Sequence, residues 1–290
     1  MKKLKQIFLF ITIIAITIIT SGCTVDDMDD INIVVTNYPN EFILDKLYSS
    51  HSTIKSIYPD GVKIDEYKIS KKQKNEYAQY DLFIYNGLIE NERSLAVELL
   101  DINPNLKIID TAYVLETEYS PEELWLNPSS LLMMAQNVRM GLKEFTSSTI
   151  LTKDIDDKYN ELKISLSELD ADFRLATEGA TNKKIIVADP ALKYLEKFNF
   201  EVYCIDADAS NKTIDDVNEL IRNKEVSYIY YFEGDELNKV AQEIKDNNKD
   251  LTEVKLHKLN NISDQERKDN EDYISIMRDN LKELNKELYQ

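Results

Sequence analysis

The feature that most constrains the fold of this chain is a pattern of buried strands that occurs twice. A β-branched run that ends in proline occupies residues 32–39, and a similar run occupies residues 184–190. Such a run is typical of a buried strand followed by a loop. Three more strand candidates follow each run, at 54–58, 81–85 and 107–110 in the first half and at 201–205, 227–232 and 253–257 in the second.

Segments of helical length lie between these strands. Examples are residues 41–48, 70–80, 191–199 and 236–247. Strands that alternate with helices indicate βαβ units, in which the strands are parallel. Two sets of such units predict an α/β protein with two similar Rossmann-like lobes.

A single long helix is predicted between the two sets. Residues 154–178 contain no glycine or proline, and their apolar residues are spaced alternately four and three apart, which gives one continuous stripe. Such a helix would be about 37 Å long. The stripe could form a dimeric coiled coil, but we favour a rigid helix that joins the two lobes of a monomer. The boundaries predict an N-terminal lobe at 31–150, a linker helix at 151–179 and a C-terminal lobe at 180–290, which ends in an amphipathic helix at 272–288.

The first 22 residues have the pattern of a secretory signal peptide. Three lysines open the chain, and the uncharged run at 7–20 is shorter than the roughly 20 apolar residues that span a membrane. Small residues then precede Cys23, as at the lipidation site of bacterial lipoproteins, although leucine is more usual there than Thr20. We expect a signal peptide at 1–22 and a lipid-anchored acidic tether at 23–30. An uncleaved anchor and ordinary secretion are the alternatives, and all three place the rest of the chain outside the cytoplasm.

Charge and cysteine content exclude several classes of partner. The formal net charge is −18, and removal of the signal peptide takes away three lysines and no acid, which leaves −18 − 3 = −21. A chain this acidic is repelled by nucleic acid and by anionic lipid. Once Cys23 carries lipid, Cys204 has no partner for an intramolecular disulfide, and its apolar neighbours predict a buried strand residue.

Four phrases, in the same order along the chain, resemble the metal-binding receptors of bacterial ABC importers of the zinc and manganese type. They are Val35-Thr36-Asn37-Tyr38-Pro39, Tyr80 to Gly87 with Glu90 just after it, Leu124-Trp125-Leu126-Asn127-Pro128, and Tyr273-x3-Met277-x2-Asn280-Leu281. The resemblance covers almost the whole mature chain. It implies two lobes, a rigid linker helix and a cleft between the lobes with ligands at the carboxyl ends of the strands.

The resemblance also implies a site for one metal ion, held by two side chains from each lobe. The family uses mostly histidines, but this chain has only two histidines in all. The matching positions hold Asp65, Glu123, Asp189 and His257, and the neighbouring Glu122 is an alternative to Glu123. His51 lies in a polar stretch and is expected at the surface. Three carboxylates with one imidazole suit Mn²⁺, Zn²⁺ or Fe²⁺.

The function implied by the resemblance is that of a receptor and not of an enzyme. It would be anchored to the cell membrane by lipid on Cys23, capture a divalent metal ion outside the cytoplasm, and pass it to an ABC permease and its ATPase. The missing histidines favour an alternative, a receptor that has lost the usual metal site and serves another ligand or an adhesion role. A metal-dependent hydrolase is a third and weaker reading, because no base and nucleophile pair accompanies the acids.

Overall fold

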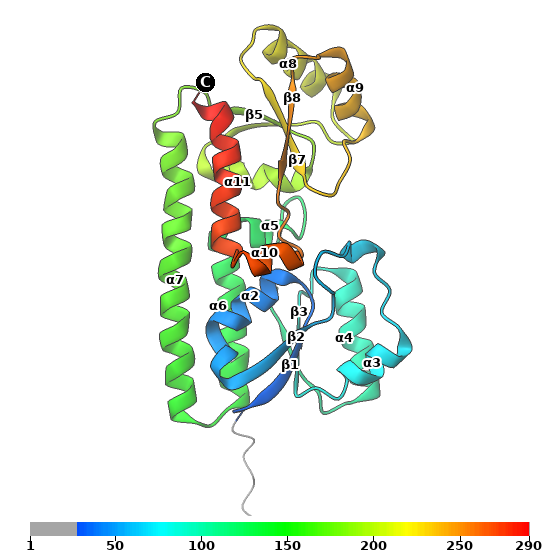
Figure 1. Ribbon diagram of the computed structural model, residues 1–290, viewed down its shortest axis with the longest axis vertical. Helices are drawn as coiled ribbons and strands as arrows, with labels where there is room; N and C mark the ends of the chain where they lie inside the picture. Colours follow the sequence, from blue (N-terminus) through cyan, green and yellow to red (C-terminus); the bar gives the residue numbers. More distant parts are fainter. Residues whose placement is uncertain (1–27, 290) are drawn as a thin grey trace, which may run out of the picture.

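Each half of the chain forms a four-stranded sheet in which all strands are parallel (Figure 1). The first sheet has the order β2-β1-β3-β4 and the second has the matching order β6-β5-β7-β8. The bounds are β1 Ile31–Val35, β2 Ser52–Ser56, β3 Leu82–Tyr85, β4 Lys107–Asp110, β5 Lys184–Val187, β6 Glu201–Cys204, β7 Tyr228–Phe232 and β8 Thr252–Leu256. All eight strands predicted from the sequence are therefore confirmed, as are the two similar α/β lobes.

The computed structural model describes residues 28–289. The predicted signal peptide, Cys23 and most of the acidic tether lie outside these residues. Helices cover both sheets, with the bounds α2 Tyr38–Tyr48, η1 Ser49–His51, η2 Ile64–Glu66, α3 Lys71–Tyr77, α4 Glu90–Ile102, α5 Glu123–Leu126, α6 Pro128–Phe145, α7 Thr149–Glu178, η3 Pro190–Phe198, α8 Asn211–Arg222, α9 Lys239–Asn247, α10 Asp264–Lys268 and α11 Tyr273–Leu288. Within the described part of the chain, no helix combines the length and the apolarity that crossing a membrane requires.

One predicted helix differs in type from the expectation. Residues 191–199 were expected to form an α-helix, and the structure has the 3-10 helix η3 at Pro190–Phe198. The side chain of Asp189 caps its start by accepting a hydrogen bond from the amide of Ala191 at 2.8 Å. Asn199 adopts a left-handed backbone conformation, with φ of 65°, and ends the helix.

The long helix α7 runs along both lobes and packs against helices from each of them (Figure 1). It starts at Thr149, two residues before the predicted linker helix at 151–179, because Ser148 caps it by accepting a hydrogen bond from the amide of Leu151. Its buried residues include five of the seven apolar residues of the predicted stripe, and the full buried set is Leu151, Ile155, Leu162, Leu166, Leu169, Phe173 and Thr177. The stripe is thus buried inside one chain, against α2, α6 and α11, and does not need a second copy.

Glu92, in the first turn of α4, fixes the loops that follow β1 and β3. Its carboxylate accepts hydrogen bonds from the hydroxyl of Thr36 at 2.5 Å, the side-chain amide of Asn37 at 3.0 Å and the backbone N–H of Asn86 at 2.7 Å. Burial raises the pKa of Glu92 to about 7, although these hydrogen bonds act in the opposite direction. The carboxyl ends of two central strands are therefore held by a group that titrates near neutral pH.

The packing of α7 gives a first prediction. Leu169 is fully buried, whereas Ile164, on the other face of the same helix, is 61% exposed. We expect Leu169→Ala to lower the free energy of unfolding by about 2–5 kcal/mol, because it leaves a cavity in the core that α7 helps to form. Ile164→Ala is the matched control and should change it by less than about 0.5 kcal/mol. Urea unfolding followed by circular dichroism measures both, and equal effects of the two variants would contradict this role of the stripe.

A second prediction concerns the pH dependence of stability. Because the folded pKa of Glu92 lies above its ordinary value of 4.5, its neutral form adds stability that is complete below pH 4.5 and is lost as the pH rises through about 7. Relative to Glu92→Gln, which stays neutral, the wild type should lose roughly 3 kcal/mol between pH 5 and pH 8. Urea unfolding at both pH values tests this, with the exposed Glu90→Gln as the control that should follow the wild type. The same pH dependence in Glu92→Gln and in the wild type would refute the role of Glu92.

Candidate functional site

Residues 257–267, which we name the crossing segment, run from the end of β8 in the C-terminal lobe to the N-terminal lobe. The carbonyl of Asn260 accepts a hydrogen bond from the amide of Tyr38 at 3.1 Å, and the carbonyl of Ile262 accepts one from the amide of Gly61 at 2.9 Å. Gly61 has a φ of 73°, a conformation that glycine adopts without strain. The loop that carries Asp65 is therefore attached directly to the crossing segment.

Side chains of the crossing segment strengthen this attachment. The amide of Asn261 donates to the carbonyls of Pro59 at 2.9 Å and Val62 at 3.0 Å. Further along, the guanidinium of Arg267 pairs with Glu41 at 2.7 Å and with Asp60 at 2.5 Å. Together these contacts fix the spacing between the lobes on this side of the molecule.

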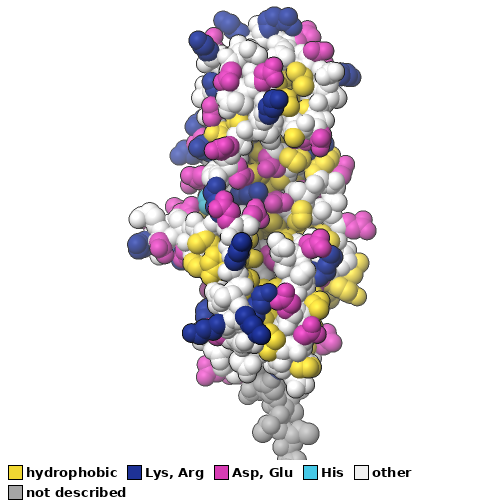
Figure 2. Space-filling view, turned by 90° about the vertical axis from the view of Figure 1, so that its right-hand side faces the viewer, with side chains coloured by type: hydrophobic (Ala, Val, Ile, Leu, Met, Phe, Trp, Pro, Cys, Tyr) yellow, Lys and Arg dark blue, Asp and Glu magenta, His cyan; other side chains and the backbone are white. Residues whose placement is uncertain are grey.

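A pocket of about 360 Å³ lies between the lobes beside the crossing segment. Its ionisable lining residues come from both lobes and comprise Lys63, Asp65, Glu66, Glu233, Asp235, His257, Lys258 and Glu266. On the face shown in Figure 2, acidic and basic side chains gather at the waist of the molecule, where the two lobes meet. Since strands of both sheets end at this waist, the pocket occupies the place where parallel α/β sheets usually bind ligands.

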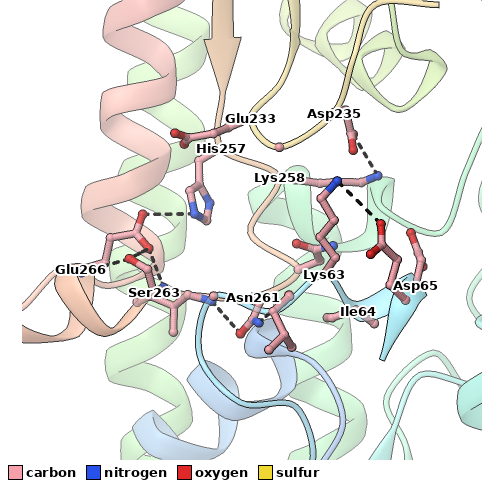
Figure 3. A pocket seen from close by; sticks show the side chains of 16 residues that line it. Lys63, Ile64, Asp65, Glu233, Asp235, His257, Lys258, Asn261, Ser263 and Glu266 are labelled. Atoms are coloured by element: carbon pink, nitrogen blue, oxygen red, sulfur yellow. Dashed lines mark hydrogen bonds and ion pairs between the residues drawn. The ribbon is translucent and has the colours of Figure 1, made fainter. Parts of the chain in front are cut away.

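Lys258 extends across the pocket toward Asp235 (Figure 3). Its Nζ lies 3.5 Å from Oε1 of Glu122 and 3.7 Å from Oδ2 of Asp235, and its side chain is 19% exposed. Burial lowers the pKa of Lys258, but nearby carboxylates outweigh it and hold the pKa above the ordinary value; these are Glu122, Asp235, Asp189 and Asp65. An internal ammonium therefore neutralises part of the negative charge that both lobes bring to the cleft.

His257 points away from this cluster, toward Glu266 (Figure 3). Its Nε2 lies 3.2 Å from Oε1 of Glu266, and its Nδ1 accepts a hydrogen bond from the amide of Leu259 at 2.9 Å. Burial lowers the pKa of His257, against the effect of Glu266 and Glu233, so the ring is neutral at pH 7. A neutral ring that accepts at Nδ1 carries its proton on Nε2, whereas a histidine that binds a metal usually donates from its second nitrogen. In this arrangement His257 has no free lone pair for a metal ion.

The backbone of His257 is held by the last helix. The amide of His257 donates to Oδ1 of Asn280 at 2.7 Å, and the side-chain amide of Asn280 donates back to the carbonyl of His257 at 2.9 Å. Asn280 belongs to the phrase that the sequence analysis assigned to the last helix of the family. Its role here is to fix the end of β8, from which both His257 and Lys258 project.

Glu123 does not face the pocket. It is 2% exposed, and its carboxylate accepts hydrogen bonds from the backbone amides of Glu118, Tyr119 and Ser120. Three amide donors occupy the oxygens that a metal ion would need, so the expected role of Glu123 as a ligand does not fit this geometry. Of the two neighbouring acids, Glu122 is the one that reaches the cleft, where it pairs with Lys258.

Asp189 and Asp65 do lie at the cleft, on opposite lobes. Asp189 is half-buried at the start of η3. Burial raises its pKa, and this effect outweighs the lowering by the amide of Ala191 and by the charge of Lys258. Asp65 lies in η2 and lines the pocket. Across residues 28–289, no three His, Cys, Asp or Glu side chains come together in a group able to hold a metal ion. The structure thus brings Asp65 and Asp189 near Lys258, turns His257 toward Glu266 and withdraws Glu123.

Sequence reasoning missed several residues of this site. Lys258, Glu266, Asp235 and Glu233 line the pocket, and none of them was predicted. Lys258 directly follows His257 in the sequence, so its place at the end of the strand could have been predicted. Only the structure shows which acids surround it. His51, which was expected at the surface, does not line the pocket; its side chain is 23% exposed, and its ring pairs with Asp29 at 2.8 Å and with Asp154 on α7 at 3.0 Å.

Comparisons with known proteins agree with this architecture. The zinc-binding lipoprotein AdcA of Streptococcus pneumoniae strain R6 is 23% identical in an alignment 288 positions long, which covers 88% of this chain and 55% of that protein. The chain thus spans about half the length of this curated relative. The crystal structure of the Zn(II)-bound ZnuA-like domain of S. pneumoniae AdcA has a TM-score of 0.70 at 22% identity, over 90% of this chain and 100% of that one. The laminin-binding protein Lbp of Streptococcus pyogenes has a TM-score of 0.71 at 16% identity, over 90% of this chain and 99% of the other.

A family model matches nearly all of the described chain. Its description is "Zinc-uptake complex component A periplasmic", and it matches residues 33–287. This is a family of transport receptors and not of enzymes, as the sequence analysis expected. Two parallel α/β lobes, a long connecting helix and an interlobe pocket thus accompany the match, and the chain belongs to the zinc-uptake complex component A family.

Proposed function

We propose that this protein is an extracytoplasmic receptor of an ABC importer, which captures a divalent transition metal ion in the pocket between its lobes. Zinc is the first candidate, ahead of Mn²⁺ and Fe²⁺. The receptor acts as a monomer, held to the membrane by lipid on Cys23, and delivers the ion to a permease and its ATPase. The observation that carries the proposal is the interlobe pocket, to which both lobes contribute carboxylates at the ends of their parallel sheets.

The chemistry of the pocket supports a divalent cation as the ligand. Asp65 from the N-terminal lobe and Asp189 from the C-terminal lobe both lie near the ammonium of Lys258. Each lobe therefore contributes negative charge to the same place. Carboxylate oxygens bind Mn²⁺ and Zn²⁺, and an imidazole favours Zn²⁺ and Fe²⁺. The names of the relatives agree, since AdcA is a zinc-binding lipoprotein. Binding requires Lys258 to leave the acidic groups, and His257 joins the ligands only if its ring gives up the contact with Glu266.

A second function is favoured by the same geometry. Lys258 already neutralises part of the charge in the cleft, His257 pairs with Glu266, and Glu123 accepts hydrogen bonds from backbone amides. Because these side chains already have partners within the chain, they suit a receptor that takes no metal and acts by binding another molecule at its surface. The names of two structural neighbours, the laminin-binding protein Lbp and the laminin-binding adhesin Lmb, state that they bind laminin. A metal titration separates the two functions.

The metal site predicts the outcome of that titration. Calorimetry of the metal-stripped protein should give a dissociation constant for Zn²⁺ below about 1 μM. Asp65→Asn and Asp189→Asn should each weaken binding by roughly tenfold or more, because each removes a charged oxygen ligand. Glu66→Gln is the matched control, since Glu66 is next to Asp65 but its side chain is 76% exposed and pairs with Lys63. The absence of sub-micromolar binding of Zn²⁺, Mn²⁺ and Fe²⁺ would leave the metal-free receptor as the function.

Glu123→Gln supplies a further check on the geometry. It should lower the melting temperature by a few degrees, because Gln cannot accept all three backbone hydrogen bonds, and it should leave zinc affinity within about twofold of the wild type. Differential scanning calorimetry and the same titration measure the two effects. A loss of zinc affinity without a loss of stability would restore Glu123 as a ligand.

The proposed anchor is tested at the N-terminus. Mass spectrometry of the mature protein should find Cys23 as the first residue with acyl chains attached, and Cys23→Ala should release the protein from the membrane fraction. A mature protein that starts elsewhere, or that retains residues 1–22, would support secretion or an uncleaved anchor instead.

A further inference from the structure

We propose that Lys258 is a built-in counter-cation of the interlobe pocket, whose ammonium occupies the acidic site until a divalent metal ion displaces it. This inference deepens the proposed function and rests on it only for the identity of the metal. It assigns a role to a residue that the expected ligand set does not contain. It also accounts for the stability of a cleft that is acidic on both sides.

The position of the ammonium supports this role. Nζ of Lys258 lies within 3.7 Å of carboxylates from two separate elements, Glu122 just before α5 and Asp235 in the loop after β7. Asp65 on η2 and Asp189 at the end of β5 add to the same electrostatic field. Four carboxylates from four segments thus act on a single cation.

Hydrogen bonds fix the backbone at Lys258, and this determines the direction in which its side chain leaves the strand end. The carbonyl of Lys258 accepts a hydrogen bond from Nε1 of Trp125 at 2.9 Å. The hydroxyl of Tyr273 in turn donates to the carbonyl of Trp125 at 2.5 Å, which ties α5 to α11. The ammonium lies 5.4 Å from the ring centre of Phe232. With the backbone held on both sides, only rotation of the side chain can bring the ammonium into the acidic groups or take it out.

The charges make the ammonium and a metal ion mutually exclusive. Like charges a few ångströms apart in a partly buried site repel strongly, so a divalent cation between Asp65 and Asp189 would drive the ammonium outward. Without the ammonium and without metal, the carboxylates would be left to repel one another. Lys258 therefore stabilises the metal-free protein and weakens the binding of metal.

The test compares Lys258 with a lysine outside the pocket. Lys258→Leu keeps an aliphatic side chain but offers no charge and no metal ligand. Lys153→Leu is the matched control, because Lys153 lies on α7 and not in the pocket lining, and its side chain is 76% exposed and pairs with Asp157 of the same helix. Both variants change the net charge equally, so a difference between them reports on position and not on total charge.

Two readouts are measured on the full mature chain. In metal-free buffer, Lys258→Leu should lower the melting temperature by about 3 °C or more, and Lys153→Leu should leave it nearly unchanged. In calorimetric titration with Zn²⁺, Lys258→Leu should bind roughly tenfold more tightly than the wild type, and Lys153→Leu should bind as the wild type does. Zinc should also raise the melting temperature of Lys258→Leu more than that of the wild type.

Each outcome has a distinct meaning. If the wild type binds zinc and Lys258→Leu binds it no more tightly, the inference is overturned while the proposed function stands. If the wild type does not bind and Lys258→Leu does, the inference stands and the metal function of the wild type falls. If no variant binds, both fall. Should Lys258→Leu not fold without metal, the charge-balanced variant Lys258→Leu/Asp235→Asn takes its place, and the same gain in zinc affinity over the wild type is required of it.

Discussion

The rest of this structure depends on the burial of one apolar stripe along α7. Leu151 at one end and Phe173 near the other are both buried, so one rigid helix is packed against both lobes. The crossing segment adds hydrogen bonds and the ion pairs of Arg267 on the pocket side. A molecule braced in this way has little freedom to open widely. The charged groups that each lobe presents to the cleft must therefore coexist at nearly fixed distances.

This constraint makes the neutralisation of the cleft a structural requirement. Asp65 and Glu122 come from the N-terminal side, and Asp189 and Asp235 come from the C-terminal lobe. In a freely hinged protein such groups could separate when no ligand is present, but here they stay close. The ammonium of Lys258 offsets the repulsion between these carboxylates when no metal is bound, and a bound divalent ion would offset it instead. The choice between the two cations is the central physical question for the function of this protein.

Much of the fold could be predicted from the sequence, because its signals are periodic and local. The eight strands are β-branched or aromatic runs between turns, and α7 shows its stripe as a four-three spacing. The start of α7 lies two residues before the predicted one, because the apolar spacing marks the buried side of a helix and not its cap at Ser148. For η3, apolar spacing could not separate a 3-10 helix from an α-helix over so few residues.

The site was only partly predictable, because side-chain direction and hydrogen-bond partners depend on tertiary structure. Asp65 and Asp189 were found from the resemblance, since the positions of loops at the strand ends follow from the shared fold. Glu122 and Glu123 are adjacent in sequence, and the choice between them depends on the three backbone amides at 118–120. His257 and Lys258 likewise project from the same strand end in different directions. No pattern of spacing shows that the lysine, and not the histidine, meets the acids.

The most direct test of this account is a crystal structure of the zinc-loaded protein with anomalous data at the zinc edge. The account predicts one zinc ion in the interlobe pocket, bound by Asp65 and Asp189, with the ammonium of Lys258 withdrawn from Glu122 and Asp235. A zinc ion elsewhere on the molecule, or one in the pocket with Lys258 still paired to both acids, would contradict it.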